Sequence, residues 1–369
     1  MKRVFWAAAA ALSLLAGCST PRPDPTPLAA YTPAIAGSPV WQAKLEGIDF
    51  PLQIAARPDA FVAAGRDGTV LALDPGSGRE LWRAQAGATL SAGVGSDGRF
   101  ASVVTRDNEV VVFEGGAERW RKRLPAGVLT APLVAGERVF VLRVDRAVMA
   151  FDALDGRPLW TYQRPGEPLT LGQAGVIAPF GNLLLVGQGP RLVALDPLRG
   201  TLRWESAVAT PRGTNEVERL ADLVGPALRL GDVVCARAFQ AAAGCVDARR
   251  GVLLWSRPSA GATALGGDAE LLLGTDATGR LTAWRTPTGE VAWSQDLLLY
   301  REPSAPLLAG SVVVVGDLEG QVHFLSRQEG ATQLRLPTDG TPVVGAPVLS
   351  GTTLLVATRG GGLFAFRPQ

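Results

Sequence analysis

One phrase of fourteen residues recurs along this chain of 369 residues. At 69–82 it reads Thr-Val-Leu-Ala-Leu-Asp-Pro-Gly-Ser-Gly-Arg-Glu-Leu-Trp, and at 191–204 it reads Arg-Leu-Val-Ala-Leu-Asp-Pro-Leu-Arg-Gly-Thr-Leu-Arg-Trp. The ends of all the copies, including one without Trp and a lone Trp near the N-terminus, are Trp41, Trp82, Trp120, Trp160, Trp204, Trp255, Trp293 and Leu334. Successive ends are 41, 38, 40, 44, 51, 38 and 41 residues apart. A period near forty residues predicts an array of eight similar structural units.

Each copy has the pattern of two β-strands joined by a tight turn. The run at 70–73 is apolar, too short for a buried helix, and ended by turn residues. In four copies an Asp precedes a Gly by four residues, and these are Asp74, Asp152, Asp196 and Asp247. An Asp carboxylate can accept backbone hydrogen bonds in a turn, and Gly tolerates positive φ. We therefore interpret the Asp series as a repeated turn device rather than a catalytic set, and the Trp series as wedges between stacked sheets.

Each unit also has a first half made of two short strands. Ala-Pro followed by apolar residues, a Gly and a second apolar run occurs at 131–142, 305–315 and 346–356. Four short strands per unit, repeated eight times, predict an all-β fold, an eight-bladed β-propeller of four-stranded antiparallel blades. The last copy stops before any Trp strand, whereas Trp41 is a Trp strand without a blade. We therefore predict that the N-terminal strand around Trp41 joins the C-terminal blade and closes the ring.

The N-terminus has the features of an export signal. Lys2 and Arg3 precede an apolar run that is too short for a stable membrane-spanning helix. The following Leu-Ala-Gly-Cys resembles the bacterial lipobox, which implies that Cys18 becomes the lipidated first residue of the mature chain. Residue 19 is Ser19 rather than Asp. In lipoproteins an Asp at this position favours retention in the inner membrane, so the resemblance implies sorting to the outer membrane. An ordinary cleaved signal with a chance Cys is the alternative.

These features divide the chain into three parts. We expect a lipoprotein signal peptide at 1–17, a lipidated Pro-rich linker at 18–39 and the propeller at 40–369. Pro-rich segments are extended and act as semi-rigid spacers. After removal of the signal peptide the chain has 34 basic and 34 acidic residues and no basic run, which argues against nucleic acid as a partner.

The repeat resembles the tryptophan-docking repeat of quinoprotein dehydrogenase-like propellers. Together with the lipobox and eight blades, it makes nearly all of 18–369 similar to the lipoprotein family of the β-barrel assembly machinery in Gram-negative outer membranes. This resemblance implies a non-catalytic scaffold without a cofactor, anchored by lipid to the outer membrane and facing the periplasm. It would aid the folding and insertion of β-barrel proteins. Its expected partners are BamA, other subunits of the machinery and nascent outer-membrane proteins.

Two segments carry the resemblance to residue level. They are Pro-Leu-Thr-Leu-Gly at 168–172, between blades 3 and 4, and Glu-Val-Glu-Arg-Leu-Ala-Asp at 216–222, between blades 4 and 5. In the family the corresponding loops dock onto the periplasmic POTRA domains of BamA, which implies partner-binding roles for Leu169, Leu171 and Asp222. We expect the two leucines to be an exposed apolar pair flanked by the charge of Asp222, which is typical of a binding hot spot. The chain departs from the family at Gly172, where an Arg is common, and at Val224, where a second acidic residue is common. The interval from 204 to 255 is the longest, so an insertion lies here whatever the family; a tolerated surface insertion is the alternative.

An enzyme is the competing interpretation, namely a quinone-dependent dehydrogenase on the same propeller. The quinone-binding relatives are much longer and carry adjacent cysteines, whereas Cys235 and Cys245 are ten residues apart. The single His, His323, is interpreted as structural, and one His cannot build a metal cluster or a nucleophile–base–acid set. Gly-x-Gly-x-x-Gly at 93–98 leads into a strand pattern, whereas a dinucleotide site needs a helix there. A carbohydrate-binding or ligand-sensing propeller is disfavoured because only three Tyr and twelve Phe are present.

The two remaining cysteines lie symmetrically about a predicted turn. Their midpoint is residue 240, so Cys235 and Cys245 should face each other across antiparallel strands. The closer, non-hydrogen-bonded kind of pair would allow a disulfide, and an oxidising periplasm would favour it. Two free buried thiols are the alternative.

Overall fold

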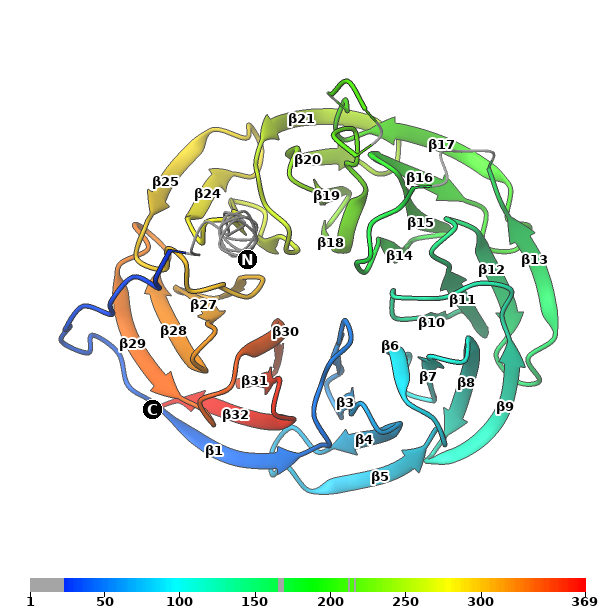
Figure 1. Ribbon diagram of the computed structural model, residues 1–369, viewed down its shortest axis with the longest axis horizontal. Helices are drawn as coiled ribbons and strands as arrows, with labels where there is room; N and C mark the ends of the chain where they lie inside the picture. Colours follow the sequence, from blue (N-terminus) through cyan, green and yellow to red (C-terminus); the bar gives the residue numbers. More distant parts are fainter. Residues whose placement is uncertain (1–22, 165–168, 212, 216) are drawn as a thin grey trace, which may run out of the picture.

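The computed structural model describes residues 23–164, 169–211, 213–215 and 217–369. The signal peptide and Cys18 lie outside the described residues, as do Pro168 and Glu216 of the two docking segments. Within the described part, every regular element is a strand, and the strands form eight four-stranded antiparallel sheets arranged in a ring (Figure 1). The predicted eight-bladed β-propeller is therefore confirmed.

The blades are numbered here in chain order. Blade 1 is β2 (Ala55–Ala56), β3 (Phe61–Ala64), β4 (Thr69–Leu73) and β5 (Glu80–Gln85); blade 2 is β6 (Leu90–Ser96), β7 (Phe100–Thr105), β8 (Glu109–Glu114) and β9 (Ala117–Arg123). Blade 3 is β10 (Leu133–Ala135), β11 (Arg138–Leu142), β12 (Val148–Asp152) and β13 (Pro158–Tyr162); blade 4 is β14 (Ile177–Phe180), β15 (Leu183–Gln188), β16 (Arg191–Leu195) and β17 (Leu202–Ala207). Blade 5 is β18 (Leu223–Leu230), β19 (Val233–Ala238), β20 (Ala242–Asp247) and β21 (Val252–Pro258); blade 6 is β22 (Gly266–Gly267), β23 (Leu271–Thr275), β24 (Leu281–Arg285) and β25 (Val291–Gln295). Blade 7 is β26 (Leu307–Ala309), β27 (Val312–Gly316), β28 (Gln321–Ser326) and β29 (Thr332–Pro337); blade 8 is β30 (Val343–Ser350), β31 (Thr353–Thr358), β32 (Gly362–Pro368) and the N-terminal β1 (Gly37–Lys44).

The ring closes through the N-terminal strand, as predicted. β1 pairs antiparallel with β32, and Trp41 lies opposite Ala365. The strand begins at Gly37, three residues before the expected boundary at 40. Residues 26–34, expected to belong to a spacer, are hydrogen-bonded to the connection after β25 and to β29. The described part of the linker is therefore attached to the ring.

The Asp-to-Gly phrase forms the turn between the third and fourth strands of a blade. Asp74 accepts a hydrogen bond from the backbone N–H of Ser77 at 2.7 Å, and Asp152 accepts one from Leu154 at 2.9 Å. The turn glycines adopt positive φ, 71° at Gly78 and 70° at Gly156. These bonds confirm the turn device proposed for the Asp series.

Five Trp residues at the ends of the repeated phrase donate a hydrogen bond to the turn of the next blade. The indole N–H of Trp120 donates to the Ala153 carbonyl at 2.8 Å, and the Trp120 ring lies against Gly156 of the same turn. The same indole-to-turn bond is formed by Trp41, Trp160, Trp255 and Trp293. Leu334 replaces Trp at the one interface where the third and fourth strands of the next blade are not joined by a turn, because β32 and β1 lie at opposite ends of the chain. Its side chain lies instead against Gly37.

The two ends of the ring differ in the connections they carry. In an antiparallel meander, connections alternate between the ends of the strands. One end, the turn end, carries the turns between first and second and between third and fourth strands. The other, the loop end, carries the turns between second and third strands together with the longer connections between blades. Backbone hydrogen bonds join these two kinds of segment at the loop end, for example from Leu223 to Gly189 and from Phe239 to Asp222.

The core lies between adjacent blades. Every residue of β4, β7 and β31 is buried, and the apolar clusters join strands of neighbouring blades, as in the cluster shared by blades 8, 1 and 2. Fourth strands such as β21 are largely exposed. A search of the described residues finds no helix of the length and apolarity that crossing a membrane requires.

Candidate partner-docking site

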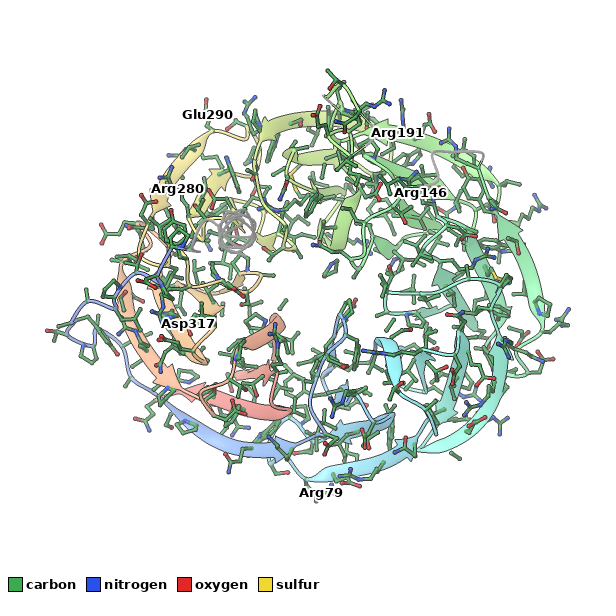
Figure 2. The ribbon with its side chains drawn as sticks, in the orientation of Figure 1. Arg79, Arg146, Arg191, Arg280, Glu290 and Asp317 are labelled. Carbon is green, nitrogen blue, oxygen red and sulfur yellow. A yellow bond between two sulfur atoms is a disulfide. The ribbon has the colours of Figure 1, made fainter. Side chains whose placement is uncertain are left out.

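The three residues predicted to bind a partner converge at the loop end. Leu169 and Leu171 lie in the connection from β13 to β14, and Asp222 ends the connection from β17 to β18. Between them lies Arg146, in the turn from β11 to β12, which the sequence had not singled out (Figure 2). Segments from three successive blades therefore meet at one point.

Arg146 and Asp222 hold the leucine loop by hydrogen bonds. One carboxylate oxygen of Asp222 accepts from the Arg146 guanidinium at 2.8 Å, and the other accepts from the backbone N–H of Leu171 at 3.0 Å. The Arg146 guanidinium also donates to the Leu169 carbonyl at 3.0 Å. Gln188 in turn donates to the Arg146 carbonyl at 2.8 Å. Charge-assisted bonds of this kind are stronger and more directional than neutral ones.

The burial of these residues differs from the expectation of an exposed apolar pair beside a surface charge. Leu169 and Leu171 are half-buried. The Asp222 side chain is only 16 % exposed, and both of its oxygens are used inside the site. Asp222 therefore positions the loop, and the surface available to a partner is the outer side of the two leucines.

The insertion before Asp222 has its own internal order. Glu218 accepts hydrogen bonds from the backbone N–H of Thr214 at 2.7 Å and from its hydroxyl at 3.0 Å. The hydrogen bond from the Thr214 backbone lowers the pKa of Glu218. Val217, at the tip of this segment, is 68 % exposed.

Two hollows border the connection from β17 to β18. One, of about 520 Å³, is lined by Asp222 and by the basic residues Arg146, Arg164, Arg191 and Arg219. The other, of about 570 Å³, is lined by Val217, Leu220, Phe239 and Pro258 together with polar residues such as Glu218. The arginine-rich hollow therefore lies next to Asp222, and the more apolar one lies farther along the same connection.

The two departures from the family pattern have different structural contexts. Gly172 is exposed, and a Cβ added there would meet nothing within 4 Å. A longer side chain could therefore occupy that position without disturbing the loop. Val224 is 5 % exposed and lies in β18, so it contributes to packing in this chain.

The features considered for an enzyme have structural roles. Residues 93–96 of the Gly-rich motif lie within β6, and the motif leads into β7, as expected. His323 is 1 % exposed and hydrogen-bonded to buried Asp317 at 3.0 Å. No group of metal-ligating side chains occurs among the residues that the structure describes.

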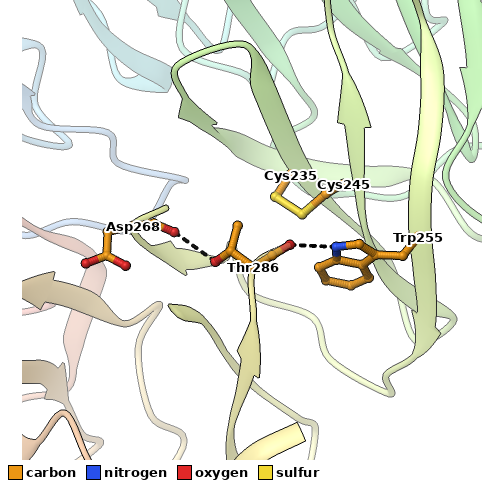
Figure 3. Close-up of a disulfide and its surroundings, with 5 residues drawn as sticks. All are labelled: Cys235, Cys245, Trp255, Asp268 and Thr286. Atoms are coloured by element: carbon orange, nitrogen blue, oxygen red, sulfur yellow. Dashed lines mark hydrogen bonds between the residues drawn. A yellow bond between two sulfur atoms is a disulfide. The ribbon is translucent and has the colours of Figure 1, made fainter. Parts of the chain in front are cut away.

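Cys235 and Cys245 lie opposite each other on β19 and β20, and the turn falls at 239–241 as predicted. Their Cα atoms are 4.0 Å apart, and the structure joins their sulfurs in a disulfide (Figure 3). The bridge lies beside Trp255, whose indole N–H donates to the Thr286 carbonyl of blade 6 at 2.7 Å. The cysteines are thus a cross-strand pair within blade 5 and do not form the adjacent pair of the quinone enzymes.

The fold is an eight-bladed β-propeller with Trp-docked blades, and solved propellers of other proteins resemble it. A quinohemoprotein alcohol dehydrogenase from Comamonas testosteroni matches with a TM-score of 0.68 at 15 % identity, covering 90 % of this chain and 76 % of that one. The crystal structure of BamB from Moraxella catarrhalis matches with a TM-score of 0.81 at 24 % identity, covering 90 % and 100 %. At these identities both likenesses concern the fold.

The sequence comparisons identify the family. The family model described as outer membrane protein assembly factor BamB matches residues 66–295. The factor of that name from Burkholderia pseudomallei is 36 % identical, covering 98 % of this chain and 97 % of the relative, and that from Bordetella pertussis is 35 % identical, covering 96 % and 95 %. The chain belongs to the BamB family of outer membrane protein assembly factors. The expectation of a non-catalytic assembly factor rather than a quinone enzyme is thereby confirmed.

Proposed function

We propose that this protein is a lipid-anchored scaffold at the periplasmic face of the outer membrane. It binds the periplasmic POTRA domains of BamA through the loop cluster of blades 3 to 5. In doing so it aids the folding and insertion of β-barrel proteins. Other subunits of the machinery and nascent outer-membrane proteins are the further partners that we propose.

One observation carries this proposal. Asp222 lies 51 residues after Leu171 in the sequence, yet it meets the segment of Leu169 and Leu171 around Arg146 in a hydrogen-bonded arrangement. A rigid loop with apolar side chains loses little conformational freedom on binding, which favours affinity. A propeller suits this role because its strands leave only short, protected edges while its loops form a broad rigid surface.

Binding to purified POTRA domains tests the docking site. Leu169→Ala combined with Leu171→Ala should weaken the complex by about 2 kcal/mol or more, as truncation of hot-spot residues does. The melting temperature should stay close to that of the parent chain, because both leucines are half-buried rather than core. Leu198→Ala, at an exposed turn-end position that is 62 % exposed, is the matched control and should bind normally. Normal affinity of the double variant would move the interface elsewhere on the ring.

Membrane fractionation tests the anchor at Cys18. Cys18→Ala should leave the propeller folded and release it into the soluble fraction in cells that lack BamA. If the variant stays with high-salt-washed outer membranes, lipid anchoring is the wrong explanation. Co-purification of BamA from detergent-solubilised membranes supports the scaffold, whereas a bound quinone would support the enzyme.

A further inference from the structure

We propose that the rim between blades 6 and 7, at the loop end, is a membrane-contact surface, held against the lipid bilayer by a docked N-terminal strap, residues 26–36. The inference rests on the proposed anchor at Cys18. The docked strap would also set the orientation of the propeller relative to the membrane, because a chain bound to the ring near its lipid limits rotation of the propeller. The surface consists of Leu297 and Tyr300, and its partner is the interfacial layer of the bilayer.

The strap is fixed to the ring by backbone bonds at both ends. The Thr26 N–H donates to the Leu299 carbonyl at 3.0 Å, in the connection between blades 6 and 7, and the Ala34 N–H donates to Gln333 on β29 at 2.9 Å. In Figure 1 this segment runs outside β29 before it enters β1. The connection from the lipid to the propeller is therefore made on the surface of blade 7.

Side chains fix the middle of the strap. The Arg335 backbone N–H donates to the Tyr31 hydroxyl at 2.8 Å, and the Arg335 guanidinium lies 5.1 Å from the centre of the Tyr31 ring. Leu28 is half-buried beside a hollow of about 280 Å³ that Leu298 and His323 also line. Apolar and cation–π contacts of this kind stabilise a docked segment.

The first strap residue is bonded to a buried charge cluster. Arg301, which is 2 % exposed, donates to the Thr26 carbonyl at 3.1 Å. The same guanidinium donates to Asp317 at 2.8 Å, and Asp317 is also bonded to His323. A fixed internal group therefore sets the point at which the chain leaves the ring toward its lipid.

The length of chain before this point limits the distance to the membrane. Cys18 and Thr26 are 26 − 18 = 8 residues apart. Fully extended, eight residues span at most about 29 Å, whatever their conformation. If the linker were free up to Gly37, the limit would be more than twice as long. Docking of the strap therefore keeps the connection between blades 6 and 7 close to the lipid headgroups.

That connection presents apolar side chains to solvent. Leu297 is 36 % exposed and Tyr300 is 37 % exposed, within four residues of each other and next to the bonding partner of Thr26. A Tyr ring with an apolar body and a polar hydroxyl suits the membrane interface. The pair therefore lies within the distance from the lipid that the short tether allows.

The position of this rim relates the membrane to the docking site. Blade 7 lies across the ring from blade 3, and the connection after blade 3 carries Leu169 and Leu171 (Figure 1). Both the strap exit and the leucines belong to the loop end. The loop end would therefore face the membrane obliquely, with the docking site farther from it, leaving space between them for a partner domain.

Energy transfer to labelled lipid tests the orientation. The lipidated chain, reconstituted in vesicles containing an acceptor-labelled lipid, carries a donor dye on Ala277→Cys in blade 6 or on Asp107→Cys in blade 2. Both positions are exposed in equivalent loop-end turns of opposite blades. Transfer should be larger from position 277 than from position 107. Leu28→Ala with Tyr31→Ala should remove most of that difference, and Leu297→Ser with Tyr300→Ser should reduce it.

The outcomes separate the strap from the anchor. Chains that float with the vesicles and give equal transfer from both positions would overturn the orientation and leave the Cys18 anchor intact. Chains that do not float would overturn both. Hydrogen exchange of the full mature chain is an independent measurement. Slow exchange at the Thr26 and Ala34 amides supports the docked strap, and exchange as fast as in an unstructured peptide contradicts it.

Discussion

The two ends of the propeller belong to the same repeat but differ in how regular their connections are. At the turn end the Gly-containing turn recurs with nearly constant geometry, since its glycines at 78, 156, 200, 251, 289 and 330 all have φ between 69° and 72°. The first four of these glycines follow an Asp by four residues. At the loop end the connections vary in length, and the arrangement around Arg146 has no counterpart in the repeated phrase. The period therefore specifies the scaffold, whereas the segments that depart from the period form contacts that the repeat does not supply.

The largest loss of stability should come from a substitution in one of the turns at the turn end. In Gly156→Ala the new Cβ would lie 2.6 Å from the Trp120 ring, at a position with φ of 70°. A left-handed conformation costs a non-Gly residue about 1–2 kcal/mol, and overpacking costs about 1–3 kcal/mol more. We expect a loss of roughly 2–5 kcal/mol in the free energy of unfolding, measured by denaturant titration.

Gly136→Ala is the matched control in the same blade. Gly136 also has positive φ, at 57°, but a Cβ there would meet nothing within 4 Å. Only the backbone cost of about 1–2 kcal/mol should remain. Equal losses in the two variants would show that the Trp contact contributes nothing measurable.

The disulfide should give the next largest effect. It closes a short loop within blade 5, so its loss in Cys235→Ala with Cys245→Ala should cost at most about 2–3 kcal/mol. The paired strands keep their register without it, so the variant should still fold. Mass spectrometry of the parent chain, alkylated without reduction after denaturation, checks the bond itself. Labelling of both cysteines would show two free thiols.

Removing the hydrogen bonds of Asp222 at the loop end should reduce stability less than the changes above but should also weaken binding. Asp222→Ala leaves the partly buried Arg146 and the Leu171 amide without a shared acceptor, so we expect a loss of about 1–2 kcal/mol in stability. Affinity for POTRA domains should fall as well, because the leucine loop loses its support. This replaces the expectation from sequence that Asp222 acts as a surface charge.

Asp232→Ala is the control for Asp222. Asp232 is paired with Arg249 at 2.8 Å, but the two side chains are 53 % and 72 % exposed. Such surface pairs contribute little, so both stability and binding should be nearly unchanged. If Asp222→Ala behaves like this control, the clamp has no energetic role.

The fold could be predicted from the sequence where local patterns recur. Strands, turns and ring closure follow from such patterns, because the same strand and turn signals appear in successive copies of the phrase. The replacement of Trp by Leu334 was visible, but its reason was not, because that reason is the missing turn between β32 and β1. The residue type at position 334 therefore depends on how the chain connects the strands of blade 8.

The site was only partly predictable. Leu169, Leu171 and Asp222 came from resemblance to a family. Arg146 could not be found, because its contact with Asp222 spans 76 residues and a turn Arg resembles any other surface residue in one sequence. The docking of the strap on blade 7 could not be predicted for a similar reason. Its Pro-rich composition predicts an extended chain, but only the fold brings Tyr31 and Arg335 together.

The smallest effect that we expect is a pH dependence from His323, at the rim that carries the strap. Burial lowers the pKa of His323, although its hydrogen bond to Asp317 opposes the shift. The folded pKa therefore lies below the unfolded value of about 6.5. As the pH falls through that value, the unfolded chain binds a proton that the folded chain resists, so the free energy of unfolding decreases.

Hydrogen bonds hold the pKa of Asp317 below its usual range despite burial, so the stabilisation that Asp317 contributes is lost only below about pH 4. Denaturant titrations between pH 7.5 and about 5 therefore isolate the histidine. His323→Gln keeps a side chain that can donate to Asp317 and removes the titration. The parent chain should lose stability over this range and the variant should lose less, so parallel curves for the two proteins would contradict the assignment.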